Sequence, residues 1–224
     1  MKINDIDYQT KSVDIFKEMS PEKIEALKKL FTSNKYRKGV ILTKPGERGK
    51  VFIVKSGRIE LYENFTNGKR FIYSILGRGR IFGDFDFEIP PVVYTRTIED
   101  SEICEINSKV FMTFLLNEPK LLLKLFQYFY IRLLIIQKKI ASSATEDVFH
   151  RLVKLLLSLG RPHETAKFSQ MITDKFTHEQ ISQMLGVSRQ TVTTMLGILQ
   201  KKGLIQKRKK SFMYDKEKLE KFNE

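Results

Sequence analysis

The stretch Leu185–Ile205, LGVSRQTVTTMLGILQKKGLI, decides the fold of the C-terminal third of the chain. Gly186 separates two segments whose apolar residues recur at helical spacing, and glycine adopts the positive φ of a tight turn at no steric cost. The apolar residues of the second segment lie on one side, at Val192, Met195, Leu196 and Leu199. The spacing predicts two helices joined by a short turn, which is a helix-turn-helix.

The ends of both helices carry capping signals. Thr177 with Gln180 three residues later is a capping-box pattern, and Ser188 is a good N-cap for the second helix. In the first helix the inward residues are Ile181, Met184 and Leu185, with Val187 filling the turn from inside. Two capped helices of this length predict a small packed unit rather than a loop.

The opposite face of the second helix is polar but almost uncharged. Arg189, Gln190, Thr193 and Gly197 point outward, with Thr194 at the border. Arg bonds guanine bidentately, Gln suits adenine, and Thr bonds a base edge or touches a thymine methyl group. We therefore expect Arg189, Gln190 and Thr193 to read bases, and Ser188, Thr191 or a backbone N–H at the helix start to hold a phosphate.

A basic segment follows this helix. Leu204-Ile205 and Phe212–Tyr214 are candidates for two short strands with Lys207–Lys210 between them, which is the pattern of a wing. Lysines and an arginine next to a recognition helix suit a phosphate backbone. The predicted DNA-binding residues are Ser188, Arg189, Gln190, Thr193, Thr194, Lys201, Lys202, Lys207, Arg208, Lys209 and Lys210.

Composition agrees with an anionic partner. The 224 residues include 40 Lys and Arg against 26 Asp and Glu, a net charge of +14. One cysteine excludes an intramolecular disulfide and a multi-cysteine metal or iron–sulfur site. No signal peptide or membrane span is recognised, so we expect a cytoplasmic protein that does not bind membranes. No catalytic motif is present, and we expect neither an enzyme nor a metal site.

The N-terminal half predicts strands. Residues 20–33 form a short amphipathic helix that starts with Ser20 and Pro21. From Lys38 to Ile106 short β-branched and aromatic runs alternate with turn residues, and Asn67-Gly68 indicates a type I′ hairpin. Regular turns of this kind favour an antiparallel barrel or sandwich.

After the strands the chain becomes helical, first over 108–116 and then from 117 to about Ser142. The long helix is apolar on much of its surface, so one side would cover the barrel and the other a second subunit; a single buried core helix is the alternative. Residues 142–147 are expected to be a hinge, and a further helix ends at Gly160. The expected dimer-interface residues are Leu125, Phe129, Arg132, Ile136 and Ile140.

The order of these parts resembles the Crp–Fnr family of bacterial transcription regulators. KGVILTKPGE, VFIVKSGRIELY and GRGRIFGD are similar to its β-roll, and FTHEQISQMLGVSRQTVTTMLGILQKKGLI to its winged helix. The resemblance implies an α+β chain with a jelly-roll sensor domain over 1–116, a dimerisation helix over 117–143 and a DNA-binding domain over 144–224. It also implies a homodimer, a two-fold site on double-stranded DNA, allosteric control, and RNA polymerase as a partner whose contact residues leave no pattern.

The chain departs from the family members that bind cyclic AMP. Gly83-Asp84 stands where they have Gly-Glu, and alignment puts Pro91-Val92 where their phosphate-binding arginine lies. Arg96-Thr97 lies further along the strand. Without an arginine, the negative charge of a bound cyclic phosphate would have no partner, so we expect that the protein does not bind cyclic AMP. A regulator that binds a cyclic nucleotide through a modified pocket, using Gly83, Asp84, Arg96 and Thr97, is the alternative.

Two other sensor chemistries of the family lack ligands here. One cysteine cannot hold an iron–sulfur cluster, and the three histidines lie in or near the C-terminal half, so a haem in the roll would need Cys104 or Met112. We expect neither cofactor, and the effector stays unknown. In the recognition helix, Gln190 and Thr194 replace a Glu and an Arg of the best-known relatives, which predicts more A·T in the half-site. An architectural protein that binds nucleic acid without sequence preference is the remaining alternative.

Overall fold

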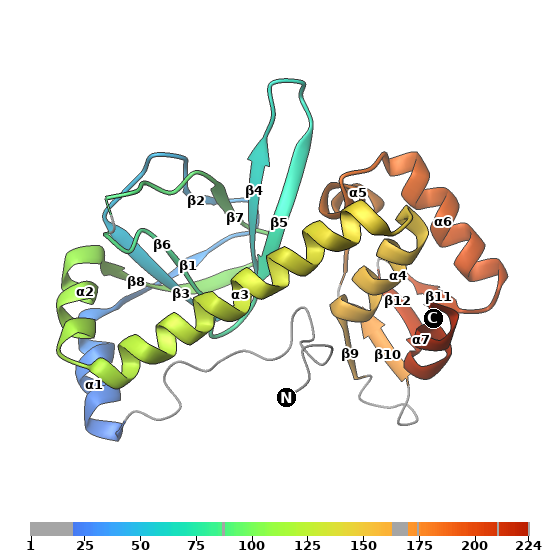
Figure 1. The fold of residues 1–224 in the computed structure, drawn as a ribbon. Coiled ribbons are helices and arrows are strands. Elements are labelled where there is room, and N and C mark those ends of the chain that lie inside the picture. Colours follow the sequence, from blue (N-terminus) through green and yellow to red (C-terminus); the bar gives the residue numbers. More distant parts are fainter. Residues whose placement is uncertain (1–19, 87, 163–169, 174, 210, 224) are drawn as a thin grey trace. The chain divides into compact units, whose positions relative to one another are not determined.

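The computed structural model describes residues 20–86, 88–162, 170–173, 175–209 and 211–223. They divide into two compact units, of which the first ends at Arg132 and the second begins at Leu133, so the division falls within helix α3 (Pro119–Thr145). Figure 1 shows the strands of the first unit and the smaller sheet of the second. Among the described residues no helix has both the length and the apolarity to cross a bilayer.

The first unit is the antiparallel β-roll that the sequence predicts. It has two four-stranded sheets, in the orders β1-β8-β3-β6 and β2-β7-β4-β5, and all strand pairs are antiparallel. The first sheet contains β1 (Thr32–Tyr36), β3 (Lys50–Ser56), β6 (Ile81–Gly83) and β8 (Ser101–Asn107). The second contains β2 (Ile41–Thr43), β4 (Ile59–Asn64), β5 (Arg70–Leu76) and β7 (Tyr94–Thr97).

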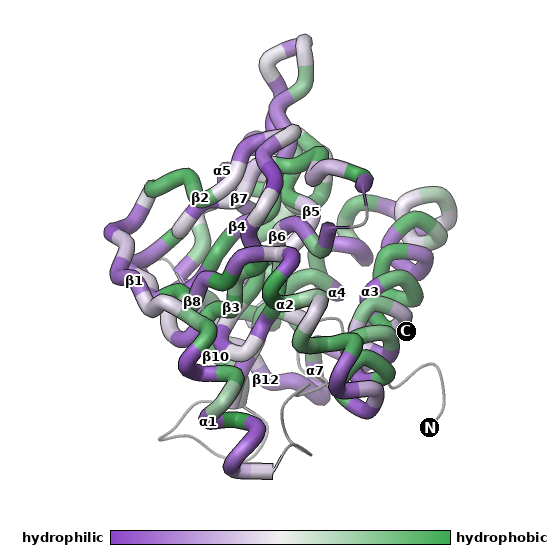
Figure 2. Tube along the Cα trace, turned by 90° about the vertical axis from the view of Figure 1, so that its left-hand side faces the viewer, coloured by the Kyte–Doolittle hydropathy of each residue, from purple (hydrophilic) through white to green (hydrophobic). Residues whose placement is uncertain are grey.

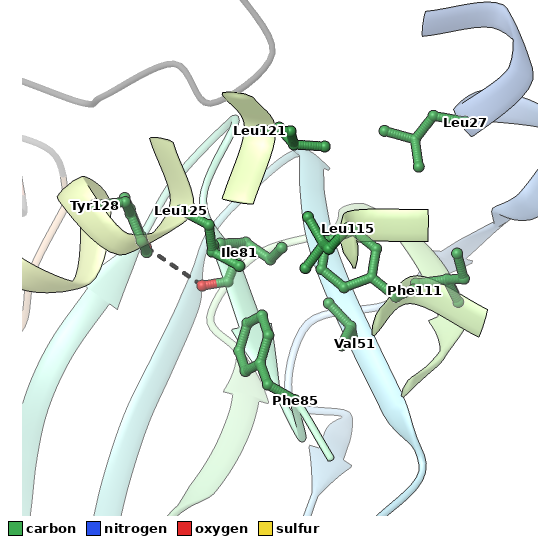
Figure 3. Packing of buried hydrophobic residues seen from close by; sticks show 10 residues of the cluster. Leu27, Val51, Ile81, Phe85, Phe111, Leu115, Leu121, Leu125 and Tyr128 are labelled. Carbon is green, nitrogen blue, oxygen red and sulfur yellow. Dashed lines mark hydrogen bonds between the residues drawn. The ribbon is translucent and has the colours of Figure 1, made fainter. Parts of the chain in front are cut away.

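Two apolar clusters hold the roll together. One lies between the sheets and consists of Phe52, Val54, Ile59, Leu76, Phe82 and Ile103. The other joins the first sheet to helices α1 (Pro21–Leu30), α2 (Ser108–Leu116) and α3, and Figure 3 shows it from close by. Within it the Tyr128 hydroxyl donates to the Ile81 carbonyl at 3.3 Å, so the helix is hydrogen-bonded as well as packed.

Local chemistry explains the first helix and the strand after it. Ser20 caps α1 by accepting from the Lys23 N–H at 3.4 Å, and Pro21 occupies the first position. The helix ends at Leu30, three residues before the predicted end. The polar run Thr32–Tyr36 is a strand that pairs with β8 from Thr32↔Glu105 to Tyr36↔Ser101. Its sequence lacks the apolar alternation of a half-buried strand, which is why sequence reasoning missed it.

The β4–β5 hairpin occurs where it was predicted, but its turn is different. Gly68 has φ 75° and donates its N–H to the Phe65 carbonyl, whereas Asn67 is not in the left-handed region. A type I′ turn needs positive φ at both central residues, so this is a longer loop with glycine at its left-handed position. The Asn67 side chain instead accepts from the Lys69 N–H at 3.0 Å. The prediction of the turn type was therefore wrong.

Helix α3 carries hydrophobic residues along much of its length, which are green in Figure 2, and they fall on two faces. One face is buried in the roll through Leu121, Leu125 and Tyr128. Another carries exposed apolar side chains, of which Phe126 is 71% and Leu123 64% exposed. The helix runs to Thr145, beyond the predicted Ser142, and Asp147 caps the following helix.

The second unit is built around a winged helix-turn-helix. Its four-stranded antiparallel sheet has the order β11-β12-β10-β9. The elements are α4 (Val148–Leu159), β9 (Gly160–Pro162), β10 (Gln170–Thr173), α5 (His178–Leu185), α6 (Arg189–Lys201), β11 (Ile205–Arg208), β12 (Ser211–Asp215) and α7 (Lys216–Asn223). The sequence patterns did not predict strands β9 and β10. The Tyr214 hydroxyl donates to the Leu156 carbonyl at 2.7 Å and ties the sheet to α4.

Candidate nucleic-acid interface

The turn between α5 and α6 has the geometry that the sequence predicts. Gly186 ends α5 in the left-handed region at φ 69°, and its N–H and that of Val187 both bond the Ser182 carbonyl. Ser188 then caps α6 by accepting from the Thr191 N–H at 3.0 Å. At the start of α5 the Thr177 and Gln180 capping box is formed. The relative direction of the two helices is thus set by backbone hydrogen bonds.

Packing then decides which face of α6 stays outside. Val192, Leu196 and Leu199 are buried against the rest of the unit, and so are Ile181, Met184 and Leu185 of α5. Met195, which the sequence assigns to the inward face, is only half-buried at the edge. The predicted contact residues at the start of α6 are all exposed: Ser188, Arg189, Gln190, Thr193 and Thr194.

Gly197 lies on the same outward face, one turn after Thr193. A Cβ atom added there would meet no atom of a neighbouring described residue within 4 Å. Glycine in a helix interior costs about 1 kcal/mol relative to alanine, and no contact among the described residues requires glycine at this position. The site is therefore open to the close approach of another molecule.

The wing forms beside α6. Strands β11 and β12 pair from Ile205↔Tyr214 to Arg208↔Ser211. Lys207 and Arg208 thus belong to β11 rather than to the tip, Lys209 is in the turn at φ 55°, and Lys210 lies outside the described residues. The described basic residues of this segment are all exposed: Lys201, Lys202, Lys207, Arg208 and Lys209.

The electrostatics of this surface are one-sided. From Gly186 to Tyr214 the sequence contains no Asp or Glu. The Lys202 ammonium lies 4.8 Å from the centre of the Phe222 ring, which holds its side chain against α7. A basic surface beside an uncharged polar helix face attracts a polyanion and still leaves hydrogen-bonding groups to contact it.

One side chain at this surface was not singled out from the sequence. His178, the first residue of α5, has its Nδ1 atom 2.9 Å from the Thr193 hydroxyl. The two residues are fifteen apart and on different helices, so only the packing of α5 on α6 brings them together. No local sequence pattern signals this contact.

The candidate effector residues Gly83 and Asp84 are engaged in the fold of the roll. Asp84 accepts from the Gly49 and Asp86 N–H groups at 2.8 and 2.9 Å, and the Arg48 Nε atom is 3.4 Å away. Burial alone would raise the pKa of the Asp84 carboxyl, but these hydrogen bonds and the guanidinium hold its pKa below the ordinary value. Gly83 has φ 113°, and a Cβ there would lie 2.4 Å from the Lys50 carbonyl oxygen.

Arg96 and Thr97 are engaged elsewhere, on the other sheet. The Arg96 guanidinium bonds the fully buried Glu60 carboxylate, which lies directly opposite it on β4. Thr97 is buried on the opposite face of the strand, where its hydroxyl donates to the Arg37 carbonyl at 2.7 Å. All four residues are thus hydrogen-bonded or closely packed within the roll.

The predicted dimer residues divide into two groups. Leu125 is 3% exposed and belongs to the core of the roll, so little of its side chain is left for a second subunit, whereas Phe129 packs against the same core but is only partly buried. Arg132 donates to the Tyr128 hydroxyl at 3.1 Å. Ile136 and Ile140 are 50% and 65% exposed. The residues that are exposed at heptad spacing are Leu123, Phe126, Tyr130, Leu133, Gln137 and Ile140, which we name the α3 seam.

Comparison with known proteins gives two domain matches. Residues 33–118 match the cyclic nucleotide-binding domain model and residues 150–222 match the Crp-like helix-turn-helix domain model. Over 204 residues the chain is 26% identical to the probable transcriptional regulator flp of Lacticaseibacillus casei, covering 88% of this chain and 90% of that protein. It is also 26% identical over 176 residues to the cAMP-activated global transcriptional regulator CRP of Salmonella typhimurium, covering 77% and 84%.

Solved structures share the fold at lower identity. A CooA variant from Carboxydothermus hydrogenoformans superposes with a TM-score of 0.76 at 24% identity, covering 96% of this chain and 98% of that one. The c-di-GMP-responsive global regulator CLP of Xanthomonas campestris has a TM-score of 0.75 at 22% identity, covering 88% and 99%. These likenesses support the fold of a β-roll followed by a winged helix.

Replacing Gly197 with Ala should have opposite effects on stability and on DNA binding. We expect the free protein to gain about 1 kcal/mol, because alanine favours the helix and meets no protein atom. Affinity for DNA should fall, because the added methyl group would stand between α6 and the groove. Calorimetric unfolding and titration of a duplex measure the two effects, and an unchanged affinity would show that this face stays away from DNA.

Replacing Asp84 with Asn should destabilise the β-roll by about 1–3 kcal/mol. The amide cannot accept both buried N–H bonds, so one donor would lose its partner. Asp86→Asn is the matched control, because Asn tolerates the φ of 60° there and the side chain is more exposed. Differential scanning calorimetry compares them, and equal unfolding temperatures for the two variants would contradict the structural role of Asp84.

Proposed function

Because the chain belongs to the Crp–Fnr family of bacterial transcription regulators, we propose that it controls transcription as a homodimer that binds a specific two-fold DNA site. Its work would be on the chromosome and thus in the cytoplasm. DNA binding follows from the family and the fold; the residue roles, the dimer contact and the independence from cyclic AMP are our proposals.

The observation that carries the proposal is the outward face of α6. It is exposed, hydrogen-bonding and uncharged except for Arg189, while the basic residues stand beside it on the wing. A surface that contacts only solvent does not require uncharged polar side chains on α6 and basic side chains on the wing to be separated. We assign Arg189, Gln190 and Thr193 to base edges, and the wing with Lys201 and Lys202 to phosphates.

We propose that this regulator does not depend on cyclic AMP. The relatives and structural neighbours are named for different effectors, cyclic AMP for some and c-di-GMP for another, so the fold alone selects none. In this chain Arg96 is paired with Glu60, and Pro91 lies where the phosphate-binding arginine would be expected, its carbonyl accepting from the Gly46 N–H at 2.8 Å. The Arg96 guanidinium is thereby engaged within the roll rather than available to a cyclic phosphate.

The α3 seam is the surface that we propose for the second subunit. Its members recur at alternating intervals of three and four residues, the spacing with which helices pair in coiled coils. Leu123, Phe126, Leu133 and Ile140 are each at least half exposed, which is unusual for a set of large apolar side chains on one helix. A second copy of the same helix would cover them.

The division between base reading and phosphate binding is testable with two variants. Full-length protein first selects its site from random duplex DNA. Arg189→Ala should then cost about 1–3 kcal/mol on that site, relax one base-pair preference and leave binding to random duplex almost unchanged. Lys209→Asn, which keeps a side chain suited to φ 55°, should weaken both duplexes alike and reduce the salt slope by about 1.

Titrations of both duplexes across salt measure these effects. Wild-type protein that binds selected and random duplexes equally would support the architectural alternative instead of a regulator. Two variants with the same profile would contradict the separate roles of helix and wing.

Repeating the titration with cyclic AMP should leave the affinity for the selected site unchanged.

Leu133→Glu should split the dimer, because it places a carboxylate from each subunit in an apolar contact. Affinity for the two-fold site should fall with it. Gln127→Glu is the control, since it adds the same carboxylate at an exposed position of α3 outside the seam. Light scattering at matched concentrations reads the mass. If the Leu133→Glu protein is still dimeric, the α3 seam is not the dimer interface.

A further inference from the structure

His178 stands where three elements of the DNA-binding unit meet. It is the first residue of α5, its Nδ1 atom is 2.9 Å from the Thr193 hydroxyl on α6, and its ring stacks near that of Phe212 on β12, at 6.4 Å between centroids and 29° between planes. The ring is therefore held by its neighbours rather than free to rotate. The assignment of Thr193 to base reading makes this contact relevant to recognition.

The hydrogen bonds of Thr193 determine what its hydroxyl can offer. A threonine hydroxyl has one hydrogen and two lone pairs. The Thr193 hydroxyl donates its hydrogen to the Arg189 carbonyl at 2.9 Å, one turn earlier in α6. Toward His178 it can then only accept, so the hydrogen of that contact belongs to Nδ1. One lone pair remains, and Thr193 faces outward.

The charge state of the imidazole agrees with this assignment. Burial lowers the pKa of His178, and the positive charges of Lys207 and Arg189 lower its pKa further. At neutral pH the ring is thus neutral and carries a single N–H. In a neutral imidazole the hydrogen bond decides which nitrogen is protonated, and an accepting Thr193 hydroxyl favours the Nδ1–H form.

We infer that His178 is a positioning residue of DNA recognition: by donating from Nδ1 it leaves the Thr193 hydroxyl as an acceptor only. Thr193 then selects a base that presents a hydrogen-bond donor in the major groove, which is adenine through its N6 amino group or cytosine through its N4 amino group. Thymine O4 and guanine O6 are acceptors and would face the remaining lone pair. This inference rests on the proposed function and deepens it at one base pair.

The test uses full-length protein, the duplex that it selects from random DNA, and a panel in which each base pair of one half-site is replaced. Thr193→Val removes the hydroxyl and identifies the pair that it reads. His178→Phe keeps a ring beside Phe212 but has no donor, while His178→Asn keeps an N–H donor near the position of Nδ1. Wild type should prefer adenine or cytosine at this pair by about two- to tenfold, the worth of one hydrogen bond.

Thr193→Val and His178→Phe should both lose that preference, the double variant should lose no more, and His178→Asn should keep it. In the free protein, ¹⁵N spectra of the ring should show Nδ1–H in wild type and a shift toward Nε2–H in Thr193→Val. If His178→Phe keeps the base preference at this pair, or loses affinity equally for every duplex, this inference is overturned while the proposed function stands. A wild-type chain that prefers no duplex would overturn the proposed function and the inference together.

Discussion

The burial of one face of α6 against α5 is the constraint on which the DNA-binding unit depends. Val192, Leu196 and Leu199 leave water together, and each such side chain contributes about 1.5–3 kcal/mol to folding. Between the two helices the Gly186 N–H bonds the Ser182 carbonyl and the Ser188 side chain accepts from the Thr191 N–H, so backbone groups at the junction find partners. The outward residues Arg189 and Gln190 take no part in this packing and stay exposed to a partner outside the protein.

The β-roll shows the opposite situation, in which polar residues are committed to the fold. Glu60 is fully buried, and a buried carboxylate is tolerated only with close partners. Arg96 bonds it, Arg70 approaches to 3.5 Å, and both guanidiniums lie over the Tyr62 ring. Asp84 likewise secures two backbone N–H groups. The roll keeps the architecture of a cyclic nucleotide-binding domain while these charges serve its own stability.

Helix α3 has two apolar faces with different surroundings. The face with Leu121, Leu125 and Tyr128 completes the core of the roll. The seam face carries side chains as large as Phe126, which the described residues of the chain leave exposed. Composition alone cannot separate these faces, since both are rich in leucine and aromatic residues. The distinction appears only when the roll occupies one of them.

The sequence by itself determined the order of the domains, the helix-turn-helix with its caps, and the exposed polar face of α6, because periodicity and capping are local properties of the chain. It did not predict the polar strand Thr32–Tyr36, the strands β9 and β10, or the turn type at Asn67-Gly68. Those depend on partners that are distant in the sequence, as β1 depends on β8. Tertiary structure alone decided that Leu125 is core, that Arg96 pairs with Glu60, and that His178 meets Thr193, because each is a contact between side chains that only the packing of separate elements brings within reach.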